Sequence, residues 1–487
     1  MLLTGEFAYK LKKPVRFSFV DFSTLERRAH FCREELRCNR RFALSLYLDV
    51  VAVTRGSDGR LVVAGDGEVV EWAVKMRQFA ADAQLDRMLE RGDLEGGMLV
   101  TFGRSLAARH GSLPARRADP AELQERVLAP AEENYDDVLS LDWVAAHRPL
   151  LERSRAAMRR QVERHRTLLE RRLETGCIRE CHGDLHLSNL VLLDEGVTAF
   201  DCLEFNPALR WIDPQSDVAF LFMDCLVRER PDLAYGFLDG YLDSAGDYEG
   251  ATLLPFYASY RSMVRAKVAA LRRGQAEPGQ AGALEDRFQR HLSWSDRWLE
   301  RAPGRLVLMC GLSGSGKSYL AERLAPRLPA VRLRSDVARK ALAGLRPTDR
   351  APDDVGRGLY DAAHTRGVYD WLVMLAGDLL QSGEHVIVDA TFLEEERRRP
   401  FLELARSLEQ PAVIVHCDAA RHVLEHRMGL RAGEGSDPSD AGPAVLQHQM
   451  RVFEAPRAGA LRVNTERSPE HQELEELARR LVAGKTG

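Results

Sequence analysis

A glycine-rich segment near residue 311 carries the most specific chemical signal in this chain. The residues that match the pattern G-x-x-x-x-G-K-[ST] are Gly311, Leu312, Ser313, Gly314, Ser315, Gly316, Lys317 and Ser318. They follow the apolar run LVLMC and precede an amphipathic stretch, so we expect a loop between a buried strand and a helix. There, backbone N–H groups face phosphate oxygens, Lys317 reaches the β- and γ-phosphates, and Ser318 holds Mg²⁺. The segment therefore predicts an ATP site with ATP and Mg²⁺ as cofactors.

Two downstream segments carry polar residues that suit phosphoryl transfer. RSDVARK places Asp336 after a second strand and Arg339 three residues later, so both can face one cleft from the first turn of a helix. Asp336 is suited to accept the proton of a substrate hydroxyl, and Arg339 to hold a polar or anionic substrate. A helix cap and a surface arginine are the alternative. In IVDAT an apolar strand ends at Asp389, which suits a carboxylate that orders Mg²⁺; a turn former is the alternative.

The region after these segments is arginine-rich and then loop-like. HRMGLR places Arg427 and Arg431 on one helical face, just before the stretch GEGSDPSDAG, residues 433–442. These arginines are suited to close as a lid over the transferring phosphoryl group, and a solvated helix face is the alternative. Strand and helix patterns alternate from LVLMC onward. That alternation predicts an α/β domain with a doubly wound parallel sheet over 304–487.

The C-terminal motifs together resemble a known group of enzymes. GLSGSGKS, RSDVARKALAGL, IVDATF, HRMGLR and SDPSDA resemble small P-loop kinases of the AAA type, which include gluconate kinase, zeta-toxin-like kinases and the kinase half of polynucleotide kinase. The resemblance covers nearly all of 304–487. It implies ATP-dependent phosphoryl transfer to a hydroxyl, with Asp336 and Arg339 on the substrate side. The acceptor stays open because these relatives phosphorylate very different hydroxyls.

A second set of phosphoryl-transfer residues lies in the N-terminal half. CHGDLHLSN carries Asp184 and Asn189 five residues apart, and Asp201 follows the hairpin-like segment VLLDEGVTAFD. Protein-kinase chemistry uses an Asp near the acceptor hydroxyl, an Asn five residues later on Mg²⁺, and a second Asp on the metal. A polar turn and hairpin without a ligand is the alternative. We interpret His186 as part of the loop structure and Asp217 as an anchor for the loop from a following helix.

This N-terminal pattern resembles the aminoglycoside phosphotransferase family, which has a protein-kinase-like α+β fold, over about residues 1–300. The resemblance implies a small lobe over about 1–80 and a helical lobe over about 81–300. It makes Asp184 the catalytic base, and Asn189 and Asp201 the metal ligands. The whole order is similar to fused bacterial proteins, with a phosphotransferase-like domain before an ATP-binding kinase domain.

The same resemblance extends to the first strand and helix. Lys10 in FAYKLKK resembles the strand lysine that pairs with ATP phosphates, and Glu35, or the adjacent Glu34, resembles its helix partner. Lys75, on a later strand, is the alternative candidate for the lysine that pairs with ATP phosphates. In this family two strands and a phosphate-covering loop precede the strand lysine, whereas only nine residues do here. Either the start of the gene is placed too late, or the lobe is naturally trimmed and covers the ATP phosphates less. For a trimmed lobe we expect a second phosphotransferase of weak or no activity; the alternative is a non-catalytic regulatory module that binds nucleotide or a metabolite.

Composition and net charge limit which kinds of protein and which acceptor substrates are expected. The chain has 487 residues and a formal net charge of −4, which predicts at least two domains and argues against a dominant nucleic-acid-binding field. A polynucleotide 5′-hydroxyl kinase therefore stays an alternative, and a small-molecule hydroxyl is the expected acceptor. The eight cysteines form no C-x-x-C pair, and no signal peptide or membrane span is evident, so we expect a cytoplasmic protein. The arginine-rich segment 150–174 predicts one long solvated helix.

Overall fold

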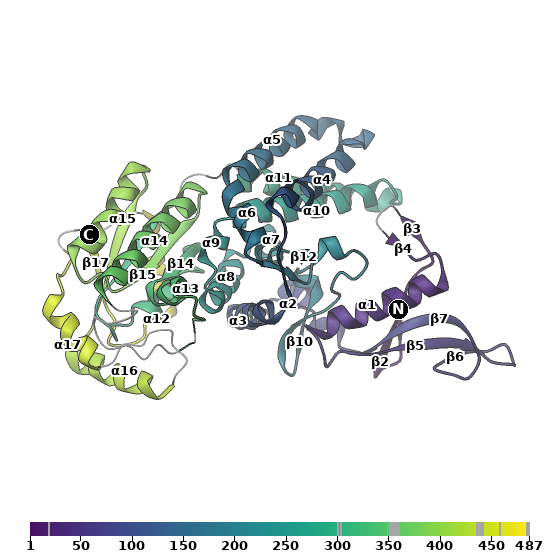
Figure 1. Cartoon of the computed structure of the whole chain (residues 1–487), viewed down its shortest axis with the longest axis horizontal. Coiled ribbons are helices and arrows are strands. Elements are labelled where there is room, and N and C mark those ends of the chain that lie inside the picture. The colour runs from purple at the N-terminus through teal and green to yellow at the C-terminus, as the bar shows by residue number, and fades with distance from the viewer. Residues whose placement is uncertain are drawn as a thin grey trace. The chain divides into compact units, whose positions relative to one another are not determined.

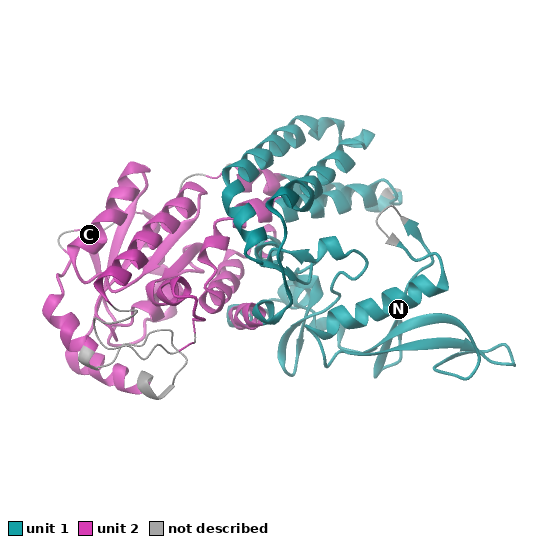
Figure 2. Ribbon diagram, in the orientation of Figure 1, with its two compact units in different colours: residues 1–98, 109–224, 260–292 teal, residues 99–108, 225–259, 293–487 magenta. Residues whose placement is uncertain are grey.

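The computed structural model describes residues 1–17, 20–299, 301, 304–347, 349, 361–434, 443–456 and 459–483 (Figure 1). The chain divides into two compact units: unit 1 is 1–98, 109–224 and 260–292, and unit 2 is 99–108, 225–259 and 293–487 (Figure 2). The domain boundary at 300–304 that the sequence predicts is a separate division of the chain and stays a prediction. The helices that continue from one unit into the other are α3 (Gly96–Ser112), α7 (Pro214–Val227), α10 (Leu254–Arg273) and α11 (Pro278–Leu299).

Unit 1 begins with an antiparallel sheet and one long helix. The sheet has the order β1-β2-β7-β5-β6 and consists of β1 (Leu2–Leu3), β2 (Phe7–Leu11), β5 (Tyr47–Arg55), β6 (Leu61–Val63) and β7 (Glu68–Arg77). Helix α1 (Leu25–Arg40) packs on β5 and β7, where Cys32 joins Val74 and Met76 in a buried apolar cluster. The predicted FAYKLKK strand is therefore present as β2, and it sets Lys10 opposite Val74.

The remainder of unit 1 is mainly helical. Its elements are β3 (Arg16–Phe17), β4 (Val20–Asp21), α2 (Leu85–Arg91), β8 (Ala115–Arg116), α4 (Ala129–Leu139), α5 (Arg148–Arg164), α6 (Arg166–Glu174), β9 (Ile178–Glu180), β10 (Leu190–Leu193), β11 (Gly196–Ala199) and β12 (Trp211–Ile212). The predicted VLLDEGVTAFD hairpin is the pair β10–β11. The expectation of one helix over 150–174 is wrong: the chain leaves helical geometry at His165, where neither glycine nor proline marks the break.

Unit 2 is built on a five-stranded parallel sheet. Its order is β14-β15-β13-β16-β17, with β13 (Leu306–Cys310), β14 (Ala330–Arg334), β15 (His385–Asp389), β16 (Ala412–Asp418) and β17 (Ala460–Asn464). The predicted strands LVLMC and IVDAT are present as β13 and β15. Because β13, β14 and β15 are neighbours, the segments that follow them meet at one edge of the sheet, where α/β proteins bind ligands.

Helices cover both faces of this sheet. They are α8 (Pro231–Ala245), α9 (Tyr248–Ala251), α12 (Lys317–Leu324), α13 (Ser335–Leu342), α14 (Ala362–Gln381), α15 (Glu395–Ser407), α16 (Arg421–Glu434), α17 (Pro443–Val452) and α18 (His471–Ala483). One face packs on α12 and α18 through Val307, Leu320 and Leu474. Helices α14 and α15 lie side by side (Figure 1), and α8 lies along the edge strand β14.

Within unit 2, α8 also packs closely on the middle of α3. A Cβ atom at Gly240 would lie 2.2 Å from the carbonyl oxygen of Val100, and one at Gly103 would lie 2.3 Å from that of Phe237. Both glycines therefore permit a backbone approach that any larger residue would prevent.

We predict that Gly240→Ala lowers the melting temperature of the full chain, because the new methyl group forces α3 and α8 apart. A destabilisation of about 1–3 kcal/mol is typical for such overpacking. The matched control is Gly236→Ala on the same helix, whose Cβ would lie 3.4 Å from Val100 Cγ2. Thermal unfolding of both variants checks this, and equal melting temperatures would contradict it.

Candidate functional site

The glycine-rich loop runs from β13 into α12, as the sequence predicts. Gly311, Gly314 and Gly316 have φ angles of +144°, +80° and +77°, which favour glycine. A Cβ at Gly311 would lie 2.4 Å from the carbonyl oxygen of Cys417, so glycine is needed for this approach to β16. Gly316 is the N-cap of α12, and Lys317 is its first residue. The loop therefore presents a helix N-terminus, which suits phosphate.

Two side chains from later segments hold the loop in place. Gln449 Oε1 accepts a hydrogen bond from the backbone N–H of Ser313 at 2.8 Å, and its Nε2 donates to Ser313 Oγ at 2.9 Å. Thr465 Oγ1 donates to the carbonyl oxygen of Ser315 at 2.6 Å. These bonds fix the loop conformation from α17 and from the segment after β17.

Arg427, predicted to belong to a lid, lies against the same loop. Its Nη1 donates to the carbonyl oxygen of Gly314 at 3.2 Å, and its Nη2 donates to that of Thr465 at 2.5 Å. The guanidinium thus joins α16 to the loop, and its role as part of a lid stays a prediction. The side chain of Arg431 lies outside the described residues, as does nearly all of 433–442.

Lys317 and Ser318 stand in the first turn of α12. The Lys317 side chain is buried, and its Nζ donates to the carbonyl oxygen of Leu312 at 2.9 Å. Asp336 and Arg339 lie in α13, which starts directly after β14. Arg339 is buried and donates through Nη1 to Thr365 Oγ1 at 3.1 Å, so α14 fixes its position.

Asp389 ends β15, next to the strand that leads into the phosphate loop. It pairs in register with Met309 on β13 and with Arg334 on β14. The side chain is buried, and its Oδ2 has no hydrogen-bond partner among the described residues. A buried carboxylate oxygen with coordination to spare fits a hard cation such as Mg²⁺, and the hydroxyl of Ser318 is a second oxygen donor of the same kind.

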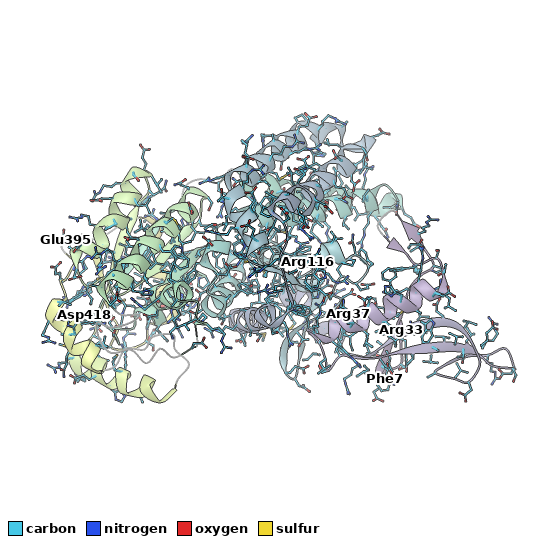
Figure 3. All side chains as sticks on the ribbon, viewed as in Figure 1. Phe7, Arg33, Arg37, Arg116, Glu395 and Asp418 are labelled. Atoms are coloured by element: carbon cyan, nitrogen blue, oxygen red, sulfur yellow. The ribbon has the colours of Figure 1, made fainter. Side chains whose placement is uncertain are left out.

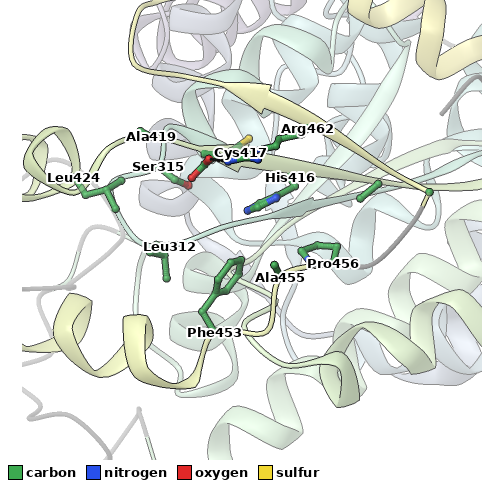
Figure 4. A pocket seen from close by; sticks show the side chains of 13 residues that line it. Leu312, Ser315, His416, Cys417, Ala419, Leu424, Phe453, Ala455, Pro456 and Arg462 are labelled. Atoms are coloured by element: carbon green, nitrogen blue, oxygen red, sulfur yellow. Dashed lines mark hydrogen bonds and ion pairs between the residues drawn. The ribbon is translucent and has the colours of Figure 1, made fainter. Parts of the chain in front are cut away.

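A pocket of about 550 Å³ opens beside the phosphate loop (Figure 4). Leu312 and Ser315 of the loop line it, together with His416 and Phe453. The rings of His416 and Phe453 lie 5.5 Å apart and are tilted by 39°. A space of this size next to a phosphate loop can accommodate a small organic ligand.

In unit 1, Lys10 lies between two carboxylates. Its Nζ is 2.8 Å from Glu35 Oε1 and 2.5 Å from Asp201 Oδ1. The predicted pairing with Glu35 is therefore present, whereas Glu34 pairs with Arg37. Burial alone would lower the pKa of Lys10, but Glu35 and Asp201 outweigh it and hold this pKa well above its usual value.

A second lysine, which sequence reasoning missed, completes this cluster. Nζ of Lys12 lies 2.7 Å from Glu35 Oε2 and also pairs with Glu204. The Lys12 side chain is buried. Because side chains two residues apart in extended chain face the same side, the spacing from Lys10 was a usable signal. The rival Lys75 instead lies over the ring of Phe7, with Nζ 4.0 Å from its centroid.

Asp184 lies in a network with the residues that follow it. Asn189 Nδ2 donates to the carbonyl oxygen of Asp184 at 2.9 Å and to its Oδ2 at 3.1 Å. His186 Nε2 lies 3.4 Å from the same Oδ2, and Arg265 Nη1 lies 3.2 Å from that ring nitrogen. Burial raises the pKa of Asp184, but His186 and Arg265 outweigh it and hold this pKa well below its usual value. His186 therefore contacts the carboxylate directly and does more than shape the loop.

Helix α7 anchors this loop, as predicted for Asp217. Asp217 accepts hydrogen bonds from the backbone N–H groups of His182 at 2.8 Å and Gly183 at 2.9 Å. About two helical turns further along α7, Asp224 Oδ2 accepts a hydrogen bond from the backbone N–H of Leu187 at 3.0 Å. Buried carboxylates thus satisfy backbone donors that the irregular loop cannot pair with itself.

Helix α1 is tied to the segments that carry this chemistry. Two arginines at the end of this helix contact the carboxylate of Glu180: Arg37 Nη2 lies 2.6 Å and Arg41 Nη1 lies 2.9 Å from its oxygens. Arg210 Nε lies 2.9 Å from the same carboxylate. Figure 3 labels Arg37 on α1. Pattern reading had no means of finding these pairs, because Glu180 lies more than a hundred residues from its helical partners.

Comparison with known proteins gives matches to most of the chain and to its C-terminal part. A family model described as an AAA domain matches residues 306–456. An uncharacterized protein of Mycobacterium tuberculosis is 32% identical over 450 residues, which cover 92% of this chain and 87% of that protein. The adenylyl-sulfate kinase of Paraburkholderia xenovorans is 31% identical over 196 residues, 38% of this chain and 96% of the kinase.

A solved structure also aligns with part of the chain. The Mycobacterium tuberculosis APS kinase CysC, in complex with AMPPNP and APS, has a TM-score of 0.29 and 22% identity, covering 38% of this chain and 99% of that one. Within the part of the chain that the structure describes, no helix is both long and apolar enough to cross a membrane. All eight cysteines are free thiols.

We predict that Lys12→Met destabilises the chain, because it leaves Glu204 buried without its cation and removes one of two cations from Glu35. Breaking one side of a buried ion pair is typically worth about 3–5 kcal/mol. The matched control is Lys13→Met at the next, exposed position. Urea unfolding followed by tryptophan fluorescence checks this. An unfolding midpoint for Lys12→Met equal to that of Lys13→Met would show that the cluster does not hold the sheet and α1 together.

Proposed function

The chain belongs to the same family as the mycobacterial protein and is an ATP-dependent kinase, and we propose that its P-loop domain transfers the γ-phosphoryl group of ATP to a hydroxyl of a small molecule. The observation that carries the proposal is the juxtaposition of the phosphate loop with Asp389 on neighbouring strands β13 and β15. Asp336 follows the next strand, β14, at the same edge of the sheet. An acceptor hydroxyl held there is close to both carboxylates and to the nucleotide phosphates.

Each residue then has a separate task. Backbone N–H groups of 311–318 bind the phosphates, and Lys317 balances the charge on the β- and γ-phosphates. Asp336 accepts the proton of the attacking hydroxyl, while Arg339, held by Thr365, orients the acceptor. Ser318 and Asp389 would hold Mg²⁺, which neutralises phosphate charge when bound.

We expect Lys317→Ala to reduce phosphoryl transfer from ATP by about 100-fold or more, because it removes a cation aimed at the charge that develops on the phosphates. The measurement is transfer of label from γ-³²P-ATP into a pooled metabolite extract. The control is Lys340→Arg, which keeps a buried cation on the neighbouring helix α13. Unchanged labelling in Lys317→Ala would refute the assignment of the reaction to the P-loop domain.

For unit 1 we propose a second phosphotransferase with the fold of the aminoglycoside phosphotransferases. The proposal is supported by the Lys10–Glu35 pair and by Asp184, Asn189 and Asp201, which are the residue types that protein-kinase chemistry requires. In this proposal Lys10 binds ATP phosphates, Asp184 orients the acceptor hydroxyl, and Asn189 and Asp201 supply oxygen ligands for Mg²⁺. The ionised state of Asp184 suits a residue that accepts a hydrogen bond from that hydroxyl.

The labelling assay also tests unit 1. We expect Asp184→Ala to abolish a product that Lys317→Ala leaves intact, because the two residues would serve separate reactions. Asp194→Ala, on the turn between β10 and β11, is the control for a nearby carboxylate. If all labelled products depend on Lys317 and none on Asp184, unit 1 is instead a module that binds nucleotide or metabolite without transferring phosphate.

A further inference from the structure

Helix α8 presents one polar stripe to the edge of the parallel sheet. Tyr235, Asp239 and Asp243 are spaced four residues apart, so they lie on one face of the helix. Tyr235 donates to Glu384 Oε2 at 2.6 Å, just before β15 begins. The two aspartates continue this stripe along β14. A helix that precedes the phosphate loop by more than sixty residues in sequence thus runs along the sheet that carries it.

The partners of the two aspartates are arginines of β14. Arg332 donates to Asp239 through Nε at 2.7 Å and through Nη2 at 2.9 Å, a two-point pairing of a guanidinium with a carboxylate. Arg334 Nη1 donates to Asp243 Oδ1 at 2.6 Å. All four residues are buried or nearly so: side-chain exposure is 2% for Arg332, 4% for Asp239, 8% for Arg334 and 14% for Asp243.

Asp389 lies on the other side of the same arginines. Its Oδ2 is 3.6 Å from Arg332 Nη1 and 3.7 Å from Arg334 Nε, beyond hydrogen-bond length. This is the oxygen that has no hydrogen-bond partner among the described residues. The guanidinium groups are therefore close enough to stabilise the Asp389 carboxylate by charge, while each of them also donates short hydrogen bonds to α8.

We propose that Asp239 and Asp243 are positioning residues of the P-loop kinase, which hold Arg332 and Arg334 on α8 and so keep Asp389 Oδ2 available for Mg²⁺. The inference rests on the proposed role of Asp389 as a magnesium ligand. Without the α8 carboxylates, Asp389 is the anion nearest to Arg332 in the contacts described, and this buried guanidinium closes onto it, because an unpaired buried charge is very unfavourable. A carboxylate in a direct arginine pair then competes poorly for the cation.

The test measures how Mg²⁺ supports nucleotide binding in the full-length chain. Binding of a fluorescent ATP analogue is titrated with Mg²⁺, and the part that Lys317→Ala removes is assigned to the P-loop site. In Asp239→Asn we expect the Mg²⁺ concentration for half-maximal binding to rise about tenfold or more, the usual range when a residue behind a metal ligand is changed. Asp232→Asn, an exposed change on the same helix, is the control and should match the wild type.

A double variant distinguishes two effects of Asp239→Asn: the release of Arg332 toward Asp389, and a loss of packing around the changed residue. Asp239→Asn combined with Arg332→Met removes both buried charges, a replacement that proteins often tolerate. Restoration of the wild-type Mg²⁺ dependence in this double variant supports the proposal. A double variant as impaired as Asp239→Asn, or an Asp239→Asn chain with wild-type dependence, would overturn it.

Should Asp239→Asn fail to fold, Asp243→Asn provides a test at a less buried position, because Asp243 Oδ1 also lies 3.6 Å from Arg332 Nη2. We expect a several-fold rise in the half-maximal Mg²⁺ concentration for that variant, and no rise would overturn the proposal. A wild-type chain that binds the analogue without any dependence on Mg²⁺ would instead refute the proposed role of Asp389, so the two failures are distinguishable.

Discussion

Charge that is buried without a partner is so unfavourable that each candidate site is organised around closed sets of opposite charges. In unit 1 two lysines, Lys10 and Lys12, share Glu35 and reach one further carboxylate each. In unit 2 two arginines of β14 stand between Asp389 and the carboxylates of α8. Every one of these contacts joins segments far apart in sequence, so the same charges that suit phosphate chemistry also decide which strands and helices must pack together.

The two sets solve the same problem with different geometry. Lysine is a compact ammonium group that can bridge two carboxylates from one point, which suits the place where β2, α1 and the segment after β11 converge. Arginine has a planar fork, so Arg332 can direct Nε and Nη2 to Asp239 and still turn Nη1 toward Asp389. A guanidinium can therefore stabilise one carboxylate at a distance while it binds another directly, which a single ammonium group does less well.

Sequence patterns predict those features that depend on neighbouring residues in the chain, such as the buried strands and the phosphate loop. The central strands β13 and β15 are nearly continuous apolar runs, and the loop glycines follow from a motif that needs positive φ angles, so both could be predicted from the sequence. The pairing of Lys10 with Glu35 was predictable by resemblance. Lys12 and the α8 aspartates were not predicted. The spacing from Lys10 could have placed Lys12 on the same side of the strand, but the partners of Lys12 and of the aspartates lie on distant segments that spacing does not reveal. The break at His165 also depends on packing, since no helix-breaking residue marks it.

The place of α8 and of the middle of α3 in unit 2 was not predicted, for the same physical reason. An edge strand such as β14 carries two arginines that must be desolvated once the sheet is covered, and 304–347 offers them no carboxylate in the contacts described. The chain supplies those carboxylates from α8, and the close contact of Gly240 with Val100 then brings part of α3 with it. Residues 99–108 and 225–259 thus join the C-terminal sheet because the charges on β14 require a helix that lies earlier in the sequence. Motifs do not reveal this link, since the bonds that make it join residues 93 and 91 positions apart in the sequence.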